Sequence, residues 1–100
     1  MTQHVYELVR TRIRPECEAE MLELRPQMIA AVRERFPQLI EARLIKLDDG
    51  TWLDIATWET RDAAERAAAA FSDIPEAAAM AQFLDEIVAF EHGVDAEPVG

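Results

Sequence analysis

Apolar residues near the start of the chain recur at every second position, and further on at every third or fourth. From His4 to Arg14, both sides of the alternation carry apolar residues. One side holds Tyr6, Leu8, Arg10 and Arg12, and the other holds Val5, Glu7, Val9, Thr11 and Ile13. A period of two predicts a strand, and apolar residues on both sides indicate that both of its faces are covered.

A long helix is predicted after Pro15, which ends this strand. From Glu16 to Phe36 the apolar residues are spaced for one face of a helix, and we expect that face to point into the core. They are Cys17, Met21, Leu24, Met28, Val32 and Phe36. Pro26 lies inside the helix, where it removes one backbone hydrogen bond and predicts a kink.

A β-hairpin is predicted next, with strands from Leu39 to Leu47 and from Thr51 to Thr60 around the turn Asp48-Asp49-Gly50. A three-residue turn with Gly50 in the left-handed conformation pairs even positions with even ones. The expected partners are Leu44 with Asp54 and Ile40 with Trp58. A two-residue turn would instead pair odd positions with even ones.

Two helices and a last strand complete the pattern. Thr60 has the hydroxyl that a helix N-cap needs, and helices are predicted from Arg61 to Phe71 and from Pro75 to Val88, followed by a strand from Ala89 to Glu97. The second helix carries the apolar stripe Met80, Phe83, Leu84 and Ile87, and the strand has Phe90, His92 and Val94 on one side.

The order β-α-β-β-α-β predicts an α+β fold, the ferredoxin-like sandwich with a four-stranded antiparallel sheet in the spatial order four, one, three, two. We expect a single domain over 1–97 and a tail over 98–100. Two helices can cover only one face of the sheet, so the apolar residues on the other face predict a homodimer. Those residues are Val5, Val9, Ile13, Ile45, Leu47, Leu53 and Ile55.

Charge and composition exclude several classes of function. The 100 residues carry 20 acids against 10 bases, a formal net charge of -10, which repels phosphate backbones and anionic lipids. No apolar run is long enough to span a bilayer, and we expect a cytoplasmic protein without nucleic-acid or membrane partners. No cluster of side chains has metal-ligand spacing and no glycine-rich phosphate loop is present, so neither a metal nor a cofactor is expected.

Two segments carry a family resemblance. The first helix ends in LRPQMIAAVRERFP, with Pro26 inside it, and the hairpin leads into ATWETRDAAERA, with Trp58-Glu59-Thr60 at the strand end and a break at Ser72 to Pro75. In these features nearly the whole chain resembles the antibiotic biosynthesis monooxygenase domains of the dimeric α+β barrel superfamily. Members include cofactor-independent oxygenases of polycyclic phenols and quinols, haem-degrading enzymes and proteins without known activity.

The resemblance also bears on chemistry. In the polyketide-oxidising branch an asparagine stands four residues before the strand-ending tryptophan; that position here is Asp54, and the tryptophan is retained as Trp58. The tyrosine and arginine on helix two of that branch fall near alanines. The haem-degrading branch has an asparagine on strand one and a tryptophan and a histidine on helix two. This chain has no asparagine, and alanines near Ala67 and Ala77 take the helical positions, which argues against haem degradation.

Strand parity suggests a pocket on the helix-covered face of the sheet. It groups six residues of three neighbouring strands: Tyr6, Arg10, Trp52, Asp54, Trp58 and His92. If Tyr6 lies opposite Trp58, Arg10 lies opposite Asp54, either as a structural ion pair or as a substrate-binding pair. Met80 and Phe83 from the following helix would close the cavity.

The candidate catalytic residues are Asp54 and His92. A histidine titrates near neutral pH and suits a general base toward a phenol, and a carboxylate on the covered face needs a partner. The candidate substrate-binding residues are Trp58, Trp52, Tyr6, Arg10, Met80 and Phe83. Two of these residues have an alternative, purely structural role. Trp58 would pack against the helix, and Tyr6 would fill the core.

Two classes of function stay open. One is a small cofactor-independent monooxygenase whose aromatic, polyketide-like substrate supplies its own electrons, in a dry pocket with one base. The other is a non-catalytic dimeric module of the same fold that binds a hydrophobic aromatic small molecule or serves a structural role. The alanines on helix two favour the second class, whereas Asp54, Trp58 and His92 on one side favour the first.

Overall fold

The computed structural model describes residues 3–97, and the predicted tail over 98–100 lies outside them. The strands are β1 (Val5–Ile13), β2 (Leu39–Lys46), β3 (Trp52–Trp58) and β4 (Leu84–Gly93). The α-helices are α1 (Glu18–Arg35), α2 (Arg61–Ala70) and α3 (Pro75–Ala81). Short 3-10 helices are η1 (Pro15–Cys17), before α1, and η2 (Phe71–Asp73), between α2 and α3.

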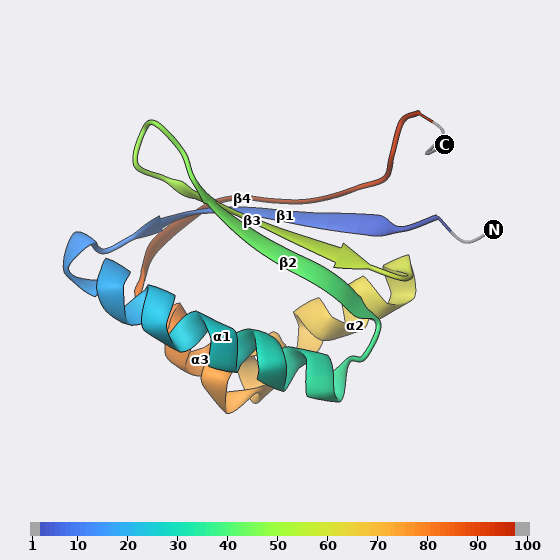
Figure 1. Ribbon diagram of the computed structural model, residues 1–100, viewed down its shortest axis with the longest axis horizontal. Helices are drawn as coiled ribbons and strands as arrows, with labels where there is room; N and C mark the ends of the chain where they lie inside the picture. The colour runs from blue at the N-terminus through green and yellow to red at the C-terminus, as the bar shows by residue number, and fades with distance from the viewer. Residues whose placement is uncertain (1–2, 98–100) are drawn as a thin grey trace.

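The strands form an antiparallel sheet in the order β2-β3-β1-β4, and the helices cover one of its faces (Figure 1). This is the predicted α+β, ferredoxin-like arrangement. The core lies between the layers, where Val32 of α1, Phe36 just after α1 and Trp58 of β3 are buried with the alanines of α2. Within residues 3–97, no helix combines the length and the apolar character needed to span a bilayer.

Local sequence signals set the hairpin and the start of α2 as expected. Gly50 has φ +87°, and the Leu47 N–H donates to the Thr51 carbonyl at 2.8 Å, closing a three-residue turn. Leu44 lies opposite Asp54, but Leu39 lies opposite Trp58 where Ile40 was expected, because the register shifts between Leu39 and Glu41. The Thr60 hydroxyl accepts the Ala63 N–H at 3.1 Å and caps α2.

The predicted pairing of β1 with β3 is wrong by one residue. Val5, not Tyr6, lies opposite Trp58, and Val9, not Arg10, lies opposite Asp54. Because side chains alternate along a strand, this slip exchanges the two faces of β1. Val5, Glu7, Val9, Thr11 and Ile13 therefore face the helices, and Tyr6, Leu8, Arg10 and Arg12 face away.

The face without helices is consequently different from the one expected. Val5, Val9 and Ile13 leave it, and Leu8 joins Ile45, Leu53 and Ile55 across three adjacent strands. These four side chains are partly exposed. The face still carries an apolar centre, flanked by Tyr6, Arg10 and Arg43.

The last helix is shorter than predicted and the last strand starts earlier. α3 ends at Ala81 and β4 begins at Leu84, whereas the expected helix ran to Val88. Two register shifts between β1 and β4 insert extra residues into β4, so Leu84, Ile87 and Phe90 all lie on the cavity side. Their three-residue spacing imitates a helix, which explains the wrong prediction.

Candidate functional site

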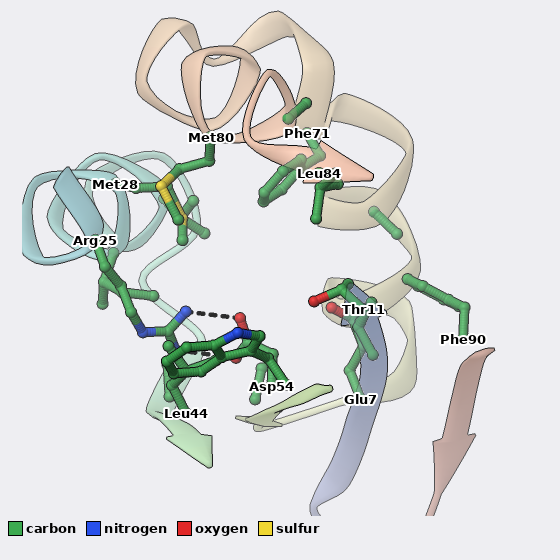
Figure 2. Close-up of a pocket in the computed structure, with 18 of the residues that line it drawn as sticks. Glu7, Thr11, Arg25, Met28, Leu44, Asp54, Phe71, Met80, Leu84 and Phe90 are labelled. Carbon is green, nitrogen blue, oxygen red and sulfur yellow. Dashed lines mark hydrogen bonds and ion pairs between the residues drawn. The ribbon is translucent and has the colours of Figure 1, made fainter. Parts of the chain in front are cut away.

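A cavity of about 330 Å³ lies between the helix-covered face of the sheet and the helices. Most of its walls are apolar, with Met21, Met28 and Ile29 from α1, Leu44 and Ala56 from the sheet, and Phe71 and Met80 from the segment after α2. Its polar lining residues in the described chain are Glu7, Thr11, Arg25 and Asp54, with the indoles of Trp52 and Trp58. Figure 2 shows the open centre, with Met28, Met80 and Leu84 on one side and Asp54 on the other.

Arg25 and Asp54 form a two-pronged ion pair at one wall of the cavity (Figure 2). Nη1 lies 2.7 Å from Oδ2 and Nη2 lies 2.9 Å from Oδ1. The side chains are 11% and 31% exposed, so water screens the pair only in part. The planar guanidinium matches the carboxylate, and both carboxylate oxygens are engaged.

Glu7 and His92 form a second polar pair, across β1 and β4. The two residues are directly opposite in the sheet, and His92 Nε2 lies 3.2 Å from Glu7 Oε2. Burial raises the pKa of the Glu7 carboxyl, the hydrogen bond and charge of His92 oppose this rise, and the charge of Asp54 adds to it. The His92 ring also packs edge-to-face on Phe90, with centroids 5.3 Å apart.

The indole N–H groups of Trp52 and Trp58 are buried, and no described residue accepts a hydrogen bond from them. Both indoles line the cavity. Trp58 is 3% exposed and meets the Phe36 ring edge-on at 6.5 Å, and the Lys46 ammonium lies 5.1 Å from the Trp52 ring. A buried N–H without a partner costs about 1–3 kcal/mol, which an oxygen atom of a ligand would offset.

The structure brings together only some of the residues selected from the sequence. Trp52, Asp54, Trp58 and Met80 line the cavity. His92 does not line the cavity itself but contacts Glu7, which does. Phe83 is half-buried but does not line the cavity; its backbone accepts the Arg14 N–H at 3.0 Å.

Tyr6 and Arg10 lie on the opposite face of the sheet, so the expected pair of Arg10 with Asp54 does not form. The Tyr6 hydroxyl donates to Asp95 Oδ2 at 3.1 Å, and this bond to a carboxylate raises the tyrosine pKa. Arg10 instead binds the hairpin turn, with Nη2 2.6 Å from Asp49 Oδ2 and Nε 3.1 Å from Thr51 Oγ1.

Sequence reasoning missed Glu7 and Arg25 as site residues. Arg25 stands four positions after Met21 and three before Met28, so a cation occupies a place spaced for the core-facing stripe of α1. Glu7 alternates with Val5 and Val9, an acid in the middle of an apolar strand face. Both signals are present in the sequence, but the one at Glu7 can be used only when it is known which face of β1 turns inward.

The described residues include no group of three or more histidine, cysteine or acidic side chains arranged to hold a metal ion. The cavity offers the ion pair of Arg25 with Asp54, the Glu7 carboxyl with its hydrogen-bond partner His92, and two indole rings, all within apolar walls. Such a set can orient a flat molecule, accept hydrogen bonds or donate them, and take up a proton.

Comparison with protein-family models gives no match, and comparison with curated proteins gives none either. Several solved structures are similar. A proposed antibiotic biosynthesis monooxygenase from Bordetella bronchiseptica has a TM-score of 0.80 at 15% identity, covering 95% of this chain and 99% of its own. A second from Caulobacter crescentus has a TM-score of 0.74 at 17% identity, with coverage of 96% and 92%.

SnoaB from Streptomyces nogalater, described as a cofactor-independent oxygenase, has a TM-score of 0.69 at 23% identity, covering 98% of this chain and 96% of its own. At such low sequence identities, the similarity shows that the fold of the backbone is shared and nothing more. Over nearly its whole length, the chain has the fold of proteins named as antibiotic biosynthesis monooxygenases.

Proposed function

We propose that the chain is a cofactor-independent oxygenase of a flat aromatic small molecule that binds between the sheet and the helices. The main support is the cavity of about 330 Å³, whose walls are mostly apolar and carry a few fixed polar groups. Small-molecule sites commonly have this form and a volume of roughly 300–1,000 Å³. SnoaB, which has the same fold, is a cofactor-independent oxygenase, and this supports the reaction class.

In the proposed reaction the substrate supplies all the electrons. A methylene group flanked by aromatic rings reacts with O₂ to give a carbonyl group and water. Four electrons pass from the substrate to O₂, one oxygen atom enters the carbonyl, and the other leaves as water with the two methylene protons. The protein contributes orientation, exclusion of water and a proton acceptor.

The indoles favour a substrate that carries a carbonyl or hydroxyl oxygen. Trp52 and Trp58 each have a buried N–H without a partner among the described residues, and both line the cavity. A ligand oxygen that accepts one of these bonds would satisfy the donor and would stabilise negative charge developing on that oxygen. The apolar walls match the rings of the same molecule.

Oxygen consumption with anthrone tests the proposal, because anthrone has a methylene between two aromatic rings and a carbonyl within the same tricycle. We expect the protein to accelerate O₂ uptake and the formation of anthraquinone. With isotopically labelled O₂, one labelled atom should appear in the product. Rates equal to those in buffer, for anthrone and for a panel of hydroxylated anthrones, would contradict the proposal.

A matched pair of helix variants links the activity to the cavity. Ala68 and Ala69 are adjacent, exposed residues of α2, and of the two only Ala68 lines the cavity. Ala68→Phe should reduce activity by narrowing the cavity, whereas Ala69→Phe should leave it unchanged. Equal effects of the two substitutions would place the reaction elsewhere.

A non-catalytic binding module of the same fold is the second candidate. It is favoured by the lining residues of α2, Ala67 and Ala68, which bring no polar group to the cavity. In that case anthrone should quench the fluorescence of Trp52 and Trp58 without any acceleration of O₂ uptake.

A further inference from the structure

Glu7 is the cavity-lining carboxylate that is best placed to take a proton from a bound molecule. It lies between Val5, which is 3% exposed, and Val9, and its own side chain is 16% exposed. Burial raises its pKa, so the carboxylate holds a proton more readily than an exposed glutamate. A raised pKa makes a carboxylate a stronger base toward a bound molecule.

Asp54 lines the same cavity but is engaged differently. Arg25 donates one hydrogen bond to each of its carboxylate oxygens, at 2.7 and 2.9 Å. Glu7 has a single side-chain partner in the described chain, His92, which contacts Oε2 only. Oε1 of Glu7 is therefore the carboxylate oxygen that is left for a substrate. Asp54, which was selected from the sequence, is less suited to accept a proton because both of its oxygens are engaged.

His92 holds the Glu7 carboxylate from the neighbouring strand. The backbone pairing places the two residues opposite one another, and the imidazole lies edge-to-face on Phe90. With the Nε2–H donating to Oε2, the ring fixes the orientation of the carboxylate. His92 is thus a positioning residue for Glu7, with no direct place in the cavity lining.

We propose that Glu7 is the proton acceptor of this site and that His92 positions it, an inference that rests on the proposed oxygenase function. The substrate C–H bond breaks and its electron pair enters the enolate, whose negative charge lies on the carbonyl oxygen. The proton forms an O–H bond with Glu7 Oε1.

The charged groups around Glu7 come from three elements. His92 approaches from β4, Asp54 from β3, and Arg25 reaches the cavity from α1. The segment from α2 to α3 contributes Ala67, Ala68, Phe71, Met80 and Ala81 to the lining, and none of these titrates. The acid side of the pH profile should therefore report Glu7, modulated by His92 and by the pair of Arg25 with Asp54.

Hydrogen–deuterium exchange of the anthrone methylene, followed by NMR under argon, measures proton removal without any need for O₂. The wild-type protein should accelerate the exchange, and Glu7→Gln should lose roughly 100-fold or more of that acceleration. Glu7→Gln should lose O₂ uptake in parallel. Tryptophan quenching by anthrone should persist, since the amide keeps the shape of the side chain.

Glu91→Gln is the matched control. It makes the same substitution on β4, opposite Leu8 on the other face of the sheet, and should leave both rates unchanged. His92→Gln should move the acid limb of the exchange profile to higher pH, because His92 lowers the pKa of Glu7. A merely structural role of His92 would lower the rate without moving that limb.

The outcomes separate the two proposals. If the wild-type protein consumes O₂ with anthrone and Glu7→Gln is equally active, the role of Glu7 is wrong while the oxygenase function stands. O₂ uptake without accelerated exchange would also overturn the role of Glu7. If the wild-type protein neither exchanges the methylene nor consumes O₂, the oxygenase function itself fails, whether or not anthrone quenches the tryptophans.

Discussion

Arg25 of α1 and Asp54 of β3 face one another through two parallel hydrogen bonds, so that a helix is tied to the sheet at the wall of the cavity. Arg25 is 11% exposed, and the loss of its partner would leave a cation largely out of water. The pair therefore has a structural role, in addition to any contact it makes with a ligand.

A double-mutant cycle should measure this tie. Asp54→Asn and Arg25→Met are each expected to lower the free energy of unfolding by about 1.5–3 kcal/mol, since each breaks hydrogen bonds between charged groups. The double variant should lose less than the sum, because it leaves no unpaired charge. Urea denaturation monitored by circular dichroism provides the measurement.

The exposed pair of Arg66 with Asp62, four residues apart on α2, is the control cycle. Its side chains are 54% and 80% exposed, and its coupling should not exceed about 0.5 kcal/mol. Equal coupling energies in the two cycles would mean that the pair of Arg25 with Asp54 stabilises the fold no more than an exposed ion pair does.

The hairpin turn should make stability depend on pH in the acid range. Hydrogen bonds from the Thr51 hydroxyl and backbone, with the hydrogen bond and charge of Arg10, lower the pKa of Asp49 from 3.8 to about 2. A lowered pKa gives stability that is present above the unfolded value and is lost as pH falls through about 2. Asp49→Asn should therefore melt below the wild-type protein at pH 6, and the difference should close between about pH 4 and pH 2. Asp48→Asn, one residue earlier, is the control. Its melting temperature should stay close to that of the wild-type protein over the same pH range.

Glu7 should affect stability in the opposite sense. Because its pKa is raised, mainly by burial, its contribution favours folding below the unfolded pKa and is lost as pH rises through the folded value. Glu7→Gln should thus raise the melting temperature at neutral pH, and the gain should disappear toward pH 4. A melting temperature unchanged at every pH would show that ionised Glu7 costs nothing in the fold.

The sheet face without helices should form the interface of a homodimer. Leu8, Ile45, Leu53 and Ile55 are adjacent on it and partly exposed, and an apolar centre with a polar rim is typical of interfaces. Ile55→Glu should shift the protein from dimer to monomer in sedimentation velocity at micromolar concentration. Leu22→Glu, on the exposed side of α1 where Leu22 is 50% exposed, should have no such effect. A monomeric wild-type protein would refute the proposed dimer.

The cap of α2 offers a test of local stability. Thr60 accepts the Ala63 N–H through its hydroxyl, and Thr60→Ala should cost about 1 kcal/mol. Thr60→Ser keeps the hydroxyl, and its free energy of unfolding should fall much less in the same urea denaturation experiment. If the two variants are equally destabilised, the cap contributes little.

Features that depend on neighbours along the chain could be predicted from the sequence. The left-handed glycine at Gly50 closes the hairpin, the Thr60 hydroxyl starts α2, and the stripe of Met28, Val32 and Phe36 directs α1 into the core. Each rests on local geometry, such as a permitted φ or a spacing of three and four residues. The order of these elements was then enough for the ferredoxin-like topology.

The facing of β1 and the start of β4 depend on contacts between distant parts of the chain and could not be predicted from the sequence. Both sides of β1 carry apolar residues, so the alternation does not distinguish Val5 from Tyr6 as the partner of Trp58, and a one-residue slip reverses every side chain. Leu84, Ile87 and Phe90 share a face only because of bulges formed against β1. The partners of Asp54 and Glu7 could not be predicted for the same reason, since Arg25 and His92 reach them from elements distant in sequence.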